Sequence, residues 1–341
     1  MNKVLVTGGC GYIGSHTIVD LINNGFDVIS ADNLVNSDTA SLEGIKQITG
    51  ISVKNYEIDL CDKAATLKIF EENPDIIGVI HFAALKSVGD SVNQPISYFH
   101  NNINSLLNVL EGIKINKVPH FIFSSSCTVY GNADELPVTE STPLKEVESP
   151  YGRTKAIAEQ IIQDVYKVMD GKSILLRYFN PAGAHDSNHL GESPINSPQN
   201  LVPVITETAI GRREKMMVFG NDYDTRDGSC LRDYIHVMDL ADAHTKALQF
   251  LQKNPDHAKV DVFNLGIGEG VTVLEAVKAF EKVNNLKLNY EIGPRREGDV
   301  IAIYADNSKS EKLLKWKPVR KIDEIMLTSW KWELKRSSKD Q

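Results

Sequence analysis

Short apolar runs alternate along the first half of the chain with longer stretches in which apolar residues recur at helical spacing. The runs predict six buried strands, at residues 3–7, 27–31, 52–56, 76–82, 121–124 and 173–178. The helical spacing predicts helices at residues 12–23, 95–114 and 151–168. Alternating strands and helices build βαβ units with right-handed crossovers. The expected fold class is therefore α/β, a Rossmann-like doubly wound parallel sheet.

The pattern changes after about residue 180. Residues 180–200 are rich in Asn, Pro, Ser and Gly, which is typical of a loop, and only short elements follow. We expect one domain over residues 1–180 and a smaller mixed α/β lobe over residues 181–341 that covers the carboxyl edge of the sheet. Some later segments, about residues 234–251, are expected to pack back on the first domain. The charged tail from Glu333 onward is expected to be frayed.

Composition and charge narrow the class of protein. The 341 residues are enough for two domains, and 42% of them are apolar, which supports a sizeable core. The net charge of −8 argues against nonspecific binding to nucleic acid or to an anionic membrane. The apolar stretches are too short for a membrane span, which needs roughly 18 residues, and the run at residues 4–6 is too short for a signal peptide. We therefore expect a cytoplasmic protein.

The cysteines and histidines lack the spacing of a disulfide framework or a metal site. The four cysteines are far apart and form no C-x-x-C pair: Cys10, Cys61, Cys127 and Cys230. The histidines show no H-E-x-x-H spacing. We expect reduced thiols and no bound metal.

A glycine-rich loop, GGCGYIG at residues 8–14, lies directly between the first strand and the first helix. Gly8 allows a tight turn, Gly11 lets the backbone approach a pyrophosphate, and Gly14 allows close packing of the helix on the strand. Free N–H groups at the start of the helix favour phosphate. Asp32, after the second strand, is suited to a ribose diol and would repel a 2′-phosphate. The pattern predicts NAD rather than NADP.

Two further segments at the ends of predicted strands are candidates for cofactor contacts. Asp59 and Leu60 follow the third strand and suit contacts with an adenine, although Asp59 could equally cap a helix. Phe82, Ala83 and Lys86 lie just past the fourth strand, at the edge where ligands bind. Small alanines there would let the backbone lie close to a cofactor, and simple packing is the alternative.

Residues 151–155 read Y-x-x-x-K, and this spacing places Tyr151 and Lys155 on one face of a helix. A phenol titrates near 10, which is too high for a good base at neutral pH. A nearby ammonium and a positively charged nicotinamide would both favour the phenolate, so the pKa of Tyr151 is expected to fall. The serine run at residues 124–126 ends the fifth strand and offers a hydroxyl beside the tyrosine. The combination predicts hydride chemistry at a carbinol.

These residues resemble the extended, sugar-nucleotide branch of the short-chain dehydrogenase/reductase superfamily. Five motifs are similar to those of the UDP-glucose 4-epimerase family: TGGCGYIGSH at 7–16, SSSCTVYG at 124–131, RYFNPAG at 177–183, RDYIHVMDL at 232–240 and RREGD at 295–299. The resemblance covers nearly the whole chain, to about Trp332. It implies a homodimeric, NAD-dependent isomerase of galactose metabolism that interconverts UDP-galactose and UDP-glucose through a transient 4-keto sugar.

The resemblance also implies roles for single residues. Tyr151 would take the proton from the sugar 4-hydroxyl while hydride passes from C4 to tightly held NAD. Ser126 would hydrogen-bond the sugar oxygen, and Lys155 would bind the nicotinamide ribose and lower the pKa of the tyrosine. The keto sugar would then turn and receive the hydride on its other face.

Residues 1–180 would accordingly form the NAD-binding domain and residues 181–341 mainly the UDP-sugar-binding lobe. The expected NAD contacts are Gly8, Gly11, Tyr12, Ile13, Gly14, Asp32, Asn33, Asn36, Ser37, Asp59, Leu60, Phe82, Ala83, Lys86, Asn101, Ser124, Tyr151, Lys155 and Tyr178. The expected UDP-sugar contacts are Lys86, Ser126, Tyr151, Phe179, Asn180, Asn200, Leu201, Phe219, Arg232, Arg296 and Asp299. The arginines suit a diphosphate because they are bidentate donors with a permanent charge.

The sequence departs from the family pattern at two places. Ile303 maps to the gate beside the sugar 2-position, where a small residue admits N-acetylated sugars and tyrosine excludes them. Isoleucine is intermediate, so the pattern leaves acceptance of UDP-N-acetyl sugars open. Cys127 stands beside the expected catalytic serine, either as a reactive thiol or as a packed small residue.

Two alternative functions remain at this point. A nucleotide-sugar 4,6-dehydratase would carry Asp-Glu after its serine or threonine, where this chain has Cys127 and Thr128. A non-catalytic NAD-sensing regulator on the same fold would have no need for Tyr151, Lys155 and Ser126 together.

Overall fold

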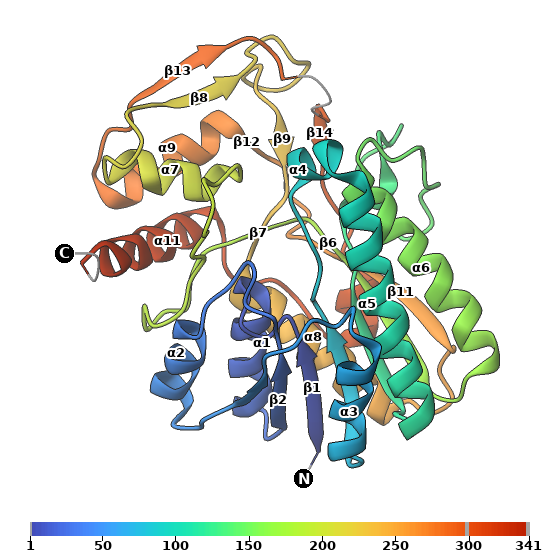
Figure 1. The fold of residues 1–341 in the computed structure, drawn as a ribbon. Helices are drawn as coiled ribbons and strands as arrows, with labels where there is room; N and C mark the ends of the chain where they lie inside the picture. Colours follow the sequence, from blue (N-terminus) through green and yellow to red (C-terminus); the bar gives the residue numbers. More distant parts are fainter. Residues whose placement is uncertain (1, 297–299, 339–341) are drawn as a thin grey trace.

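The computed structural model describes residues 2–296 and 300–338 and is built around one parallel sheet (Figure 1). Its seven strands follow the order β11-β6-β5-β4-β1-β2-β3, and every pairing between neighbours is parallel. The strands are β1 (Lys3–Thr7), β2 (Asp27–Ala31), β3 (Lys54–Tyr56), β4 (Ile76–His81), β5 (His120–Ser124), β6 (Lys172–Tyr178) and β11 (Val260–Leu265). Because the chain order reverses between β1 and β4, the sheet is doubly wound, as predicted.

Helices cover both faces of this sheet. One face carries α1 (Tyr12–Asn23), α2 (Ala40–Thr49), α8 (Val237–Lys253) and α10 (Ser308–Leu314). The other face carries α3 (Lys63–Glu72), α5 (Pro95–Asn116) and α6 (Pro150–Val168). Two short elements lie at the carboxyl edge, α4 (Val88–Asn93) and the 3-10 turn η1 (Cys127–Tyr130). None of the helices in the described residues is both long enough and apolar enough to span a membrane.

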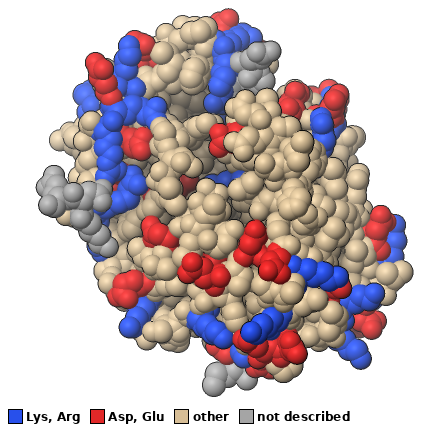
Figure 2. Space-filling view, viewed as in Figure 1, with Lys and Arg blue, Asp and Glu red and all other residues tan. Residues whose placement is uncertain are grey.

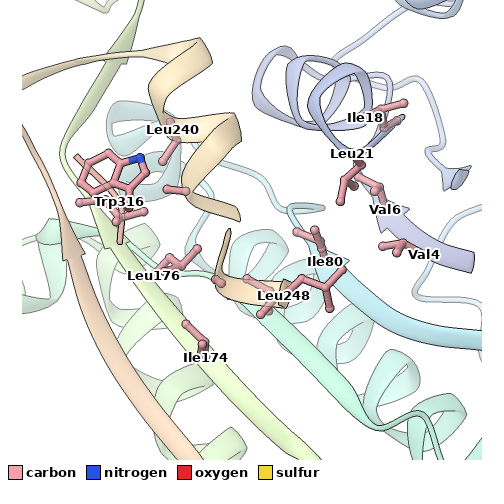
Figure 3. Packing of buried hydrophobic residues seen from close by; sticks show 14 of the residues in the cluster. Val4, Val6, Ile18, Leu21, Ile80, Ile174, Leu176, Leu240, Leu248 and Trp316 are labelled. Carbon is pink, nitrogen blue, oxygen red and sulfur yellow. The ribbon is translucent and has the colours of Figure 1, made fainter. Parts of the chain in front are cut away.

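Alternation along the central strands explains why the sheet is buried on both sides. Val4 and Val6 of β1 pack against α1, whereas Leu5 between them faces the α3, α5 and α6 layer. Figure 3 shows Ile80 of β4 beside Leu248 of α8, in the same cluster as Val4 and Val6. Complete burial of such an aliphatic side chain contributes about 1.5–3 kcal/mol, so these two clusters hold the helices on the sheet.

The second half of the chain builds a lobe of three small sheets above the carboxyl edge (Figure 1). Its strands are β7 (Asn180–Ala182), β8 (Met216–Phe219), β9 (Leu231–Arg232), β10 (Tyr234–His236), β12 (Val271–Thr272), β13 (Tyr290–Gly293) and β14 (Ala302–Ile303). Its helices are α7 (Leu201–Ala209), α9 (Val273–Asn284) and α11 (Ile322–Ser337). Figure 2 shows a surface hollowed between the lobe and the sheet, with Lys and Arg gathered along the lobe on this face.

Two features of the second half differ from the sequence-based expectations. Pattern alone assigned six strands to the sheet, and the structure adds a seventh, because β11 pairs with β6 from Val260↔Ser173 to Leu265↔Tyr178. The expectation of a frayed tail from Glu333 is wrong for residues 333–337, which lie in α11. Glu333 is buried and forms ion pairs with Arg212 and Arg336. The pair with Arg212 links the end of α11 to the segment after α7.

Candidate active site

The glycine-rich loop forms a close turn between β1 and the start of α1. Gly8 has φ = 69°, and a Cβ there would lie 2.8 Å from the backbone nitrogen of Ala83. A Cβ on Gly14 would lie 2.2 Å from the carbonyl oxygen of Gly8. The loop, the end of β4 and the first turn of α1 are therefore packed backbone against backbone. The free N–H groups of that turn form a site suited to an anion.

Asp32 lies directly beside this loop. Its Oδ2 accepts a hydrogen bond from the backbone nitrogen of Cys10 at 3.0 Å. Its Oδ1 accepts bonds from the nitrogen of Leu34 at 2.9 Å and from the hydroxyl of Ser37 at 2.8 Å. The Asp32 carboxylate and the glycine loop thus lie together. The three hydrogen bonds hold this carboxylate in one orientation.

The other candidates for cofactor contacts occupy varied settings. Asp59 caps a turn, because its Oδ1 accepts from the nitrogen of Cys61 at 2.8 Å, and Leu60 is buried. The hydroxyl of Tyr12 donates to the carbonyl of Gly183 at 2.6 Å and so joins α1 to the segment after β7. Lys86 is exposed, with its Nζ 3.4 Å from Glu192. The rest lie around the carboxyl edge of the sheet: Ile13, Asn33, Asn36, Phe82 and Asn101.

Helix α6 carries the tyrosine and the lysine. It begins at Pro150, and the hydroxyl of Ser149 caps it by accepting from the nitrogen of Gly152 at 3.1 Å, an interaction of about 1 kcal/mol. Tyr151 is partly buried, and its hydroxyl lies close to that of Ser126. Lys155, one turn later, is buried and donates from Nζ to the carbonyl oxygen of Ser124 at 2.7 Å. The three predicted catalytic groups therefore meet where α6 crosses the end of β5.

The pKa values of this group differ from the sequence-based expectation. Burial raises the pKa of the Tyr151 phenol well above its usual value of 10, and the nearby hydroxyl of Ser126 only partly opposes this rise. Burial lowers the pKa of Lys155 to about 8, and the carboxylate of Glu159 opposes the fall. Burial likewise raises the pKa of Tyr178 to about 12, and its hydroxyl shares a hydrogen bond with that of Ser124. Desolvation is thus the dominant effect of the protein on both residues of the Y-x-x-x-K pair.

Three buried polar residues beside this group were missed by the sequence analysis: Ser125, Glu159 and Arg177. Glu159 accepts from the hydroxyl of Ser125 and from two nitrogens of Arg177, at 2.9 and 2.6 Å. Ser125 and Arg177 lie in motifs that the sequence analysis quoted, but no spacing rule connects them to a glutamate on α6. Helical periodicity does place Glu159 on the face of Tyr151 and Lys155, and that was the available signal.

The candidate substrate residues lie in the lobe and at its junction with the sheet. Arg232 of β9 pairs in register with Ile303 of β14. The arginine expected to bind the diphosphate and the expected gate residue are therefore neighbours. The guanidinium of Arg296 lies over the ring of Phe219, with 5.5 Å between its carbon and the ring centre. Four others lie on β7, after β6, or at the start of α7: Phe179, Asn180, Asn200 and Leu201. Asp299 lies outside the described residues.

Asn180 and Arg232 are held together by the residue between β9 and β10. The backbone nitrogen of Asn180 donates to the carbonyl of Asp233 at 2.9 Å. The buried carboxylate of Asp233 accepts from the nitrogens of Ile267, Gly268 and Ala305, at 2.8, 3.2 and 3.1 Å. Asn180 and Arg232 are thus both anchored at Asp233, which bonds to the first and follows the second in the chain. No group of three His, Cys, Asp or Glu side chains in the part of the chain that the structure describes is arranged to hold a metal ion.

Comparison with known proteins assigns this geometry to a family. A family model described as GDP-mannose 4,6 dehydratase matches residues 5–328. A UDP-glucose 4-epimerase from Haemophilus influenzae is 47% identical over 331 residues, which is 97% of each chain. One from Bacillus subtilis is 46% identical over 331 residues, covering 97% of this chain and 96% of the relative. The chain belongs to the UDP-glucose 4-epimerase family.

Solved structures of the UDP-glucose 4-epimerase family share the complete fold. The Bifidobacterium longum enzyme, in complex with NAD+ and UDP, is 47% identical with a TM-score of 0.93, over 98% of this chain and 99% of that chain. The Stenotrophomonas maltophila enzyme, with bound NAD and formylated UDP-arabinopyranose, is 42% identical with a TM-score of 0.95, over 99% and 100%. These likenesses confirm the predicted fold class and the family resemblance.

Proposed function

We propose that the chain interconverts UDP-galactose and UDP-glucose by inverting C4 of the sugar on a tightly bound NAD. The observation that carries the proposal is the meeting of Tyr151, Lys155 and Ser126 at the carboxyl edge, on the sheet that also bears the glycine loop. The names and ligands of the relatives support it.

The loop and Asp32 fit the cofactor. The close backbone packing at Gly8 and Gly14 leaves N–H groups at the start of α1 available to a pyrophosphate. The fixed carboxylate of Asp32 suits a ribose diol and opposes a 2′-phosphate, which favours NAD. A bound NAD would supply the hydride acceptor and donor for C4 of the sugar. The residues around it hold and move the proton.

Tyr151 is the proposed base, and it takes the proton from the sugar 4-hydroxyl. Its pKa is raised in the protein alone, so the phenolate must be favoured by positive charge. Lys155 supplies one such charge from the next turn of α6, and the nicotinamide ring of a bound cofactor would supply the second. Ser126 donates a hydrogen bond to the sugar oxygen and stays in place through its bonds with Thr128. The same groups return the proton when the keto sugar is reduced on its other face.

The lobe holds the nucleotide part of the substrate in this proposal. Arg232 and Arg296 provide permanent positive charge for the diphosphate. Phe219, exposed and next to Arg296, offers an aromatic face for the base. Binding through the nucleotide leaves the sugar free to present either face to the same hydride donor.

The dehydratase alternative is disfavoured by the residues after Ser126. Elimination of water needs an acid–base pair at this place, and the chain has Cys127 and Thr128. Cys127 is buried, and burial raises the pKa of its thiol to about 12. The hydroxyl of Thr128 donates to Ser126 at 3.0 Å. Neither side chain is therefore suited to act as a general acid or base near neutral pH.

We also propose that the protein is a cytoplasmic homodimer. Apolar side chains are exposed along α4 and α5 of the cofactor domain, at Val92, Ile96 and Leu107, which supports pairing through these helices. All four cysteines are free thiols, which supports a reducing compartment. Light scattering after size-exclusion chromatography measures the mass, and a monomer at micromolar concentration contradicts the dimer.

The function is tested by incubating purified protein with UDP-galactose and no added cofactor, then identifying the products. We expect UDP-glucose without net formation of NADH. A 4-keto-6-deoxy sugar would instead establish the dehydratase, and turnover only with added cofactor would contradict tight binding of NAD. UDP-N-acetylglucosamine as a second substrate reports whether buried Ile303 leaves room at the sugar 2-position.

A further inference from the structure

A buried ion pair lies directly behind the proposed catalytic residues. The Glu159 residue is 1% exposed and Arg177 is 4% exposed. Nε and Nη2 of Arg177 donate to the two carboxylate oxygens of Glu159 at 2.9 and 2.6 Å, so the pair is bidentate. The guanidinium also lies over the ring of Tyr130, 4.9 Å from its centre. Neither residue has a role in the function proposed above.

The pair is connected to the catalytic serine run through Ser125. The Ser125 hydroxyl donates to Glu159, and its backbone nitrogen donates to the carbonyl of Leu176 on β6 at 2.9 Å. On one side the backbone carbonyl of Ser124 accepts from Lys155, and on the other side Ser126 lies close to Tyr151. The first two of three consecutive serines thus bond to the lysine and the glutamate of α6, and the third lies close to the tyrosine of the same helix.

The energetics of such a pair point to geometry rather than to stability. Taking two charges out of water costs about as much as their attraction returns, so a buried ion pair is weak support for a stabilising role. A bidentate pair with a planar guanidinium does restrict orientation, because both partners are held by two bonds each. Glu159 is on α6, Arg177 is on β6, and Ser125 directly follows β5, so the restriction acts at three elements at once.

We propose that Glu159 is a positioning residue that acts through Ser125 to hold the hydroxyl of Ser126 against Tyr151. The two bonds from Arg177 hold the Glu159 carboxylate in place. The carboxylate in turn holds Ser125, which directly follows β5 and precedes Ser126. The inference deepens the proposed function and rests on it. Loss of the link displaces Ser126 from the reacting oxygen without removing any group that binds the nucleotide or the cofactor.

Ser125→Ala is the decisive variant, because it breaks the link and leaves the ion pair intact. We expect kcat for UDP-galactose to fall by about 10- to 100-fold, the effect of a misplaced group, while KM changes less than about twofold. Ser173→Ala is the matched control: it is a fully buried serine of β6 whose hydroxyl has no partner among the described residues. Its kcat should equal that of the unaltered protein.

A double-mutant cycle separates positioning from general loosening. In a Ser126→Ala background, Ser125→Ala should cause little further loss of kcat, because the group that it positions is already absent. Independent, multiplying losses would overturn the proposal, as would an unchanged kcat in Ser125→Ala.

A measurement without turnover keeps the inference separate from the proposed function. Hydrogen exchange of the segment after β5, residues 125–130, should become faster in Ser125→Ala, while exchange in β1 and β2 stays unchanged. If the unaltered protein fails to epimerise UDP-galactose, the proposed function fails, and this exchange pattern still decides whether the link positions Ser126. Unaltered exchange over 125–130 would overturn it.

Discussion

The ammonium of Lys155 donates to the backbone carbonyl of Ser124 at 2.7 Å, so the helix with the proposed base is tied to the end of β5. Both residues are buried, and burial lowers the pKa of Lys155 to about 8. The lysine therefore has a structural bond to make as well as a charge to supply. Replacing Lys155 removes both the hydrogen bond and the charge, and each loss should have a measurable effect.

Lys155→Met is expected to reduce turnover of UDP-galactose by about 100-fold or more, because the phenolate of Tyr151 loses its neighbouring charge. The orphaned carbonyl should also cost about 1–3 kcal/mol of unfolding free energy. Lys167→Met is the control on the same helix, since Lys167 is exposed and pairs only with Asp164 in the described residues. Steady-state rates and chemical denaturation measure both effects, and equal rates in the two variants would contradict the role of Lys155.

Tyr151→Phe should lose activity by a factor of about 10²–10⁴, as expected for removal of a general base, while bound NAD is retained. Tyr166→Phe provides the comparison, because Tyr166 lies on the buried face of α6 and its hydroxyl has no partner among the described residues. That variant should keep full activity. The cofactor content of each purified protein is measured after denaturation. Full activity of Tyr151→Phe would refute the assigned base.

Asp32→Ala should weaken the preference for NAD over NADP by about tenfold or more, because the carboxylate that opposes a 2′-phosphate is gone. The change also removes the acceptor of the backbone nitrogens of Cys10 and Leu34. The affinities are measured by titration of cofactor-depleted protein with each dinucleotide. Asp27→Asn, at the opposite end of β2, should leave the preference as it is. A variant of Asp32 with undiminished preference would place the discrimination elsewhere.

Acid should destabilise the fold through buried neutral histidines. Burial lowers the pKa of His16 and His244 to about 4 and that of His81 and His236 to about 3. The unfolded chain takes up their protons near pH 6.5, so stability is present above that pH and is lost as the pH falls. Between pH 7 and 5.5 each of these histidines should lower the free energy of unfolding by about 1 kcal/mol.

Asp233 changes stability in the opposite direction. Burial raises the pKa of its carboxyl to about 6, so the folded state gains a proton first and recovers part of the loss as the pH falls. Calorimetry from pH 8 to 5 measures the sum, and His244→Gln should reduce the slope by about one proton. A Tm that does not change between pH 7 and 5.5 would show that the histidines titrate freely in the folded protein.

The parts of the site that local sequence rules govern could be predicted. The loop before α1 follows from strand, glycines and helix in succession, and the pairing of Tyr151 with Lys155 follows from helical spacing. The partners of Glu159 could not be predicted, because Ser125 and Arg177 reach it from two other strands. The same limit applied to the seventh strand, whose place beside β6 is set by the pairing of Ser173 with Val260, 87 positions later in the chain.

The edge position of β11 has a consequence for how the protein is made. Residues up to Tyr178 contain six of the seven sheet strands, yet β6 stays an open edge until residue 265 has left the ribosome. Helix α8, which covers α1, is also synthesised late. A truncated chain that ends after the sequence-predicted cofactor domain therefore lacks both an edge strand and part of its cover. The halves that the sequence assigned to cofactor and substrate are therefore expected to complete their folding together.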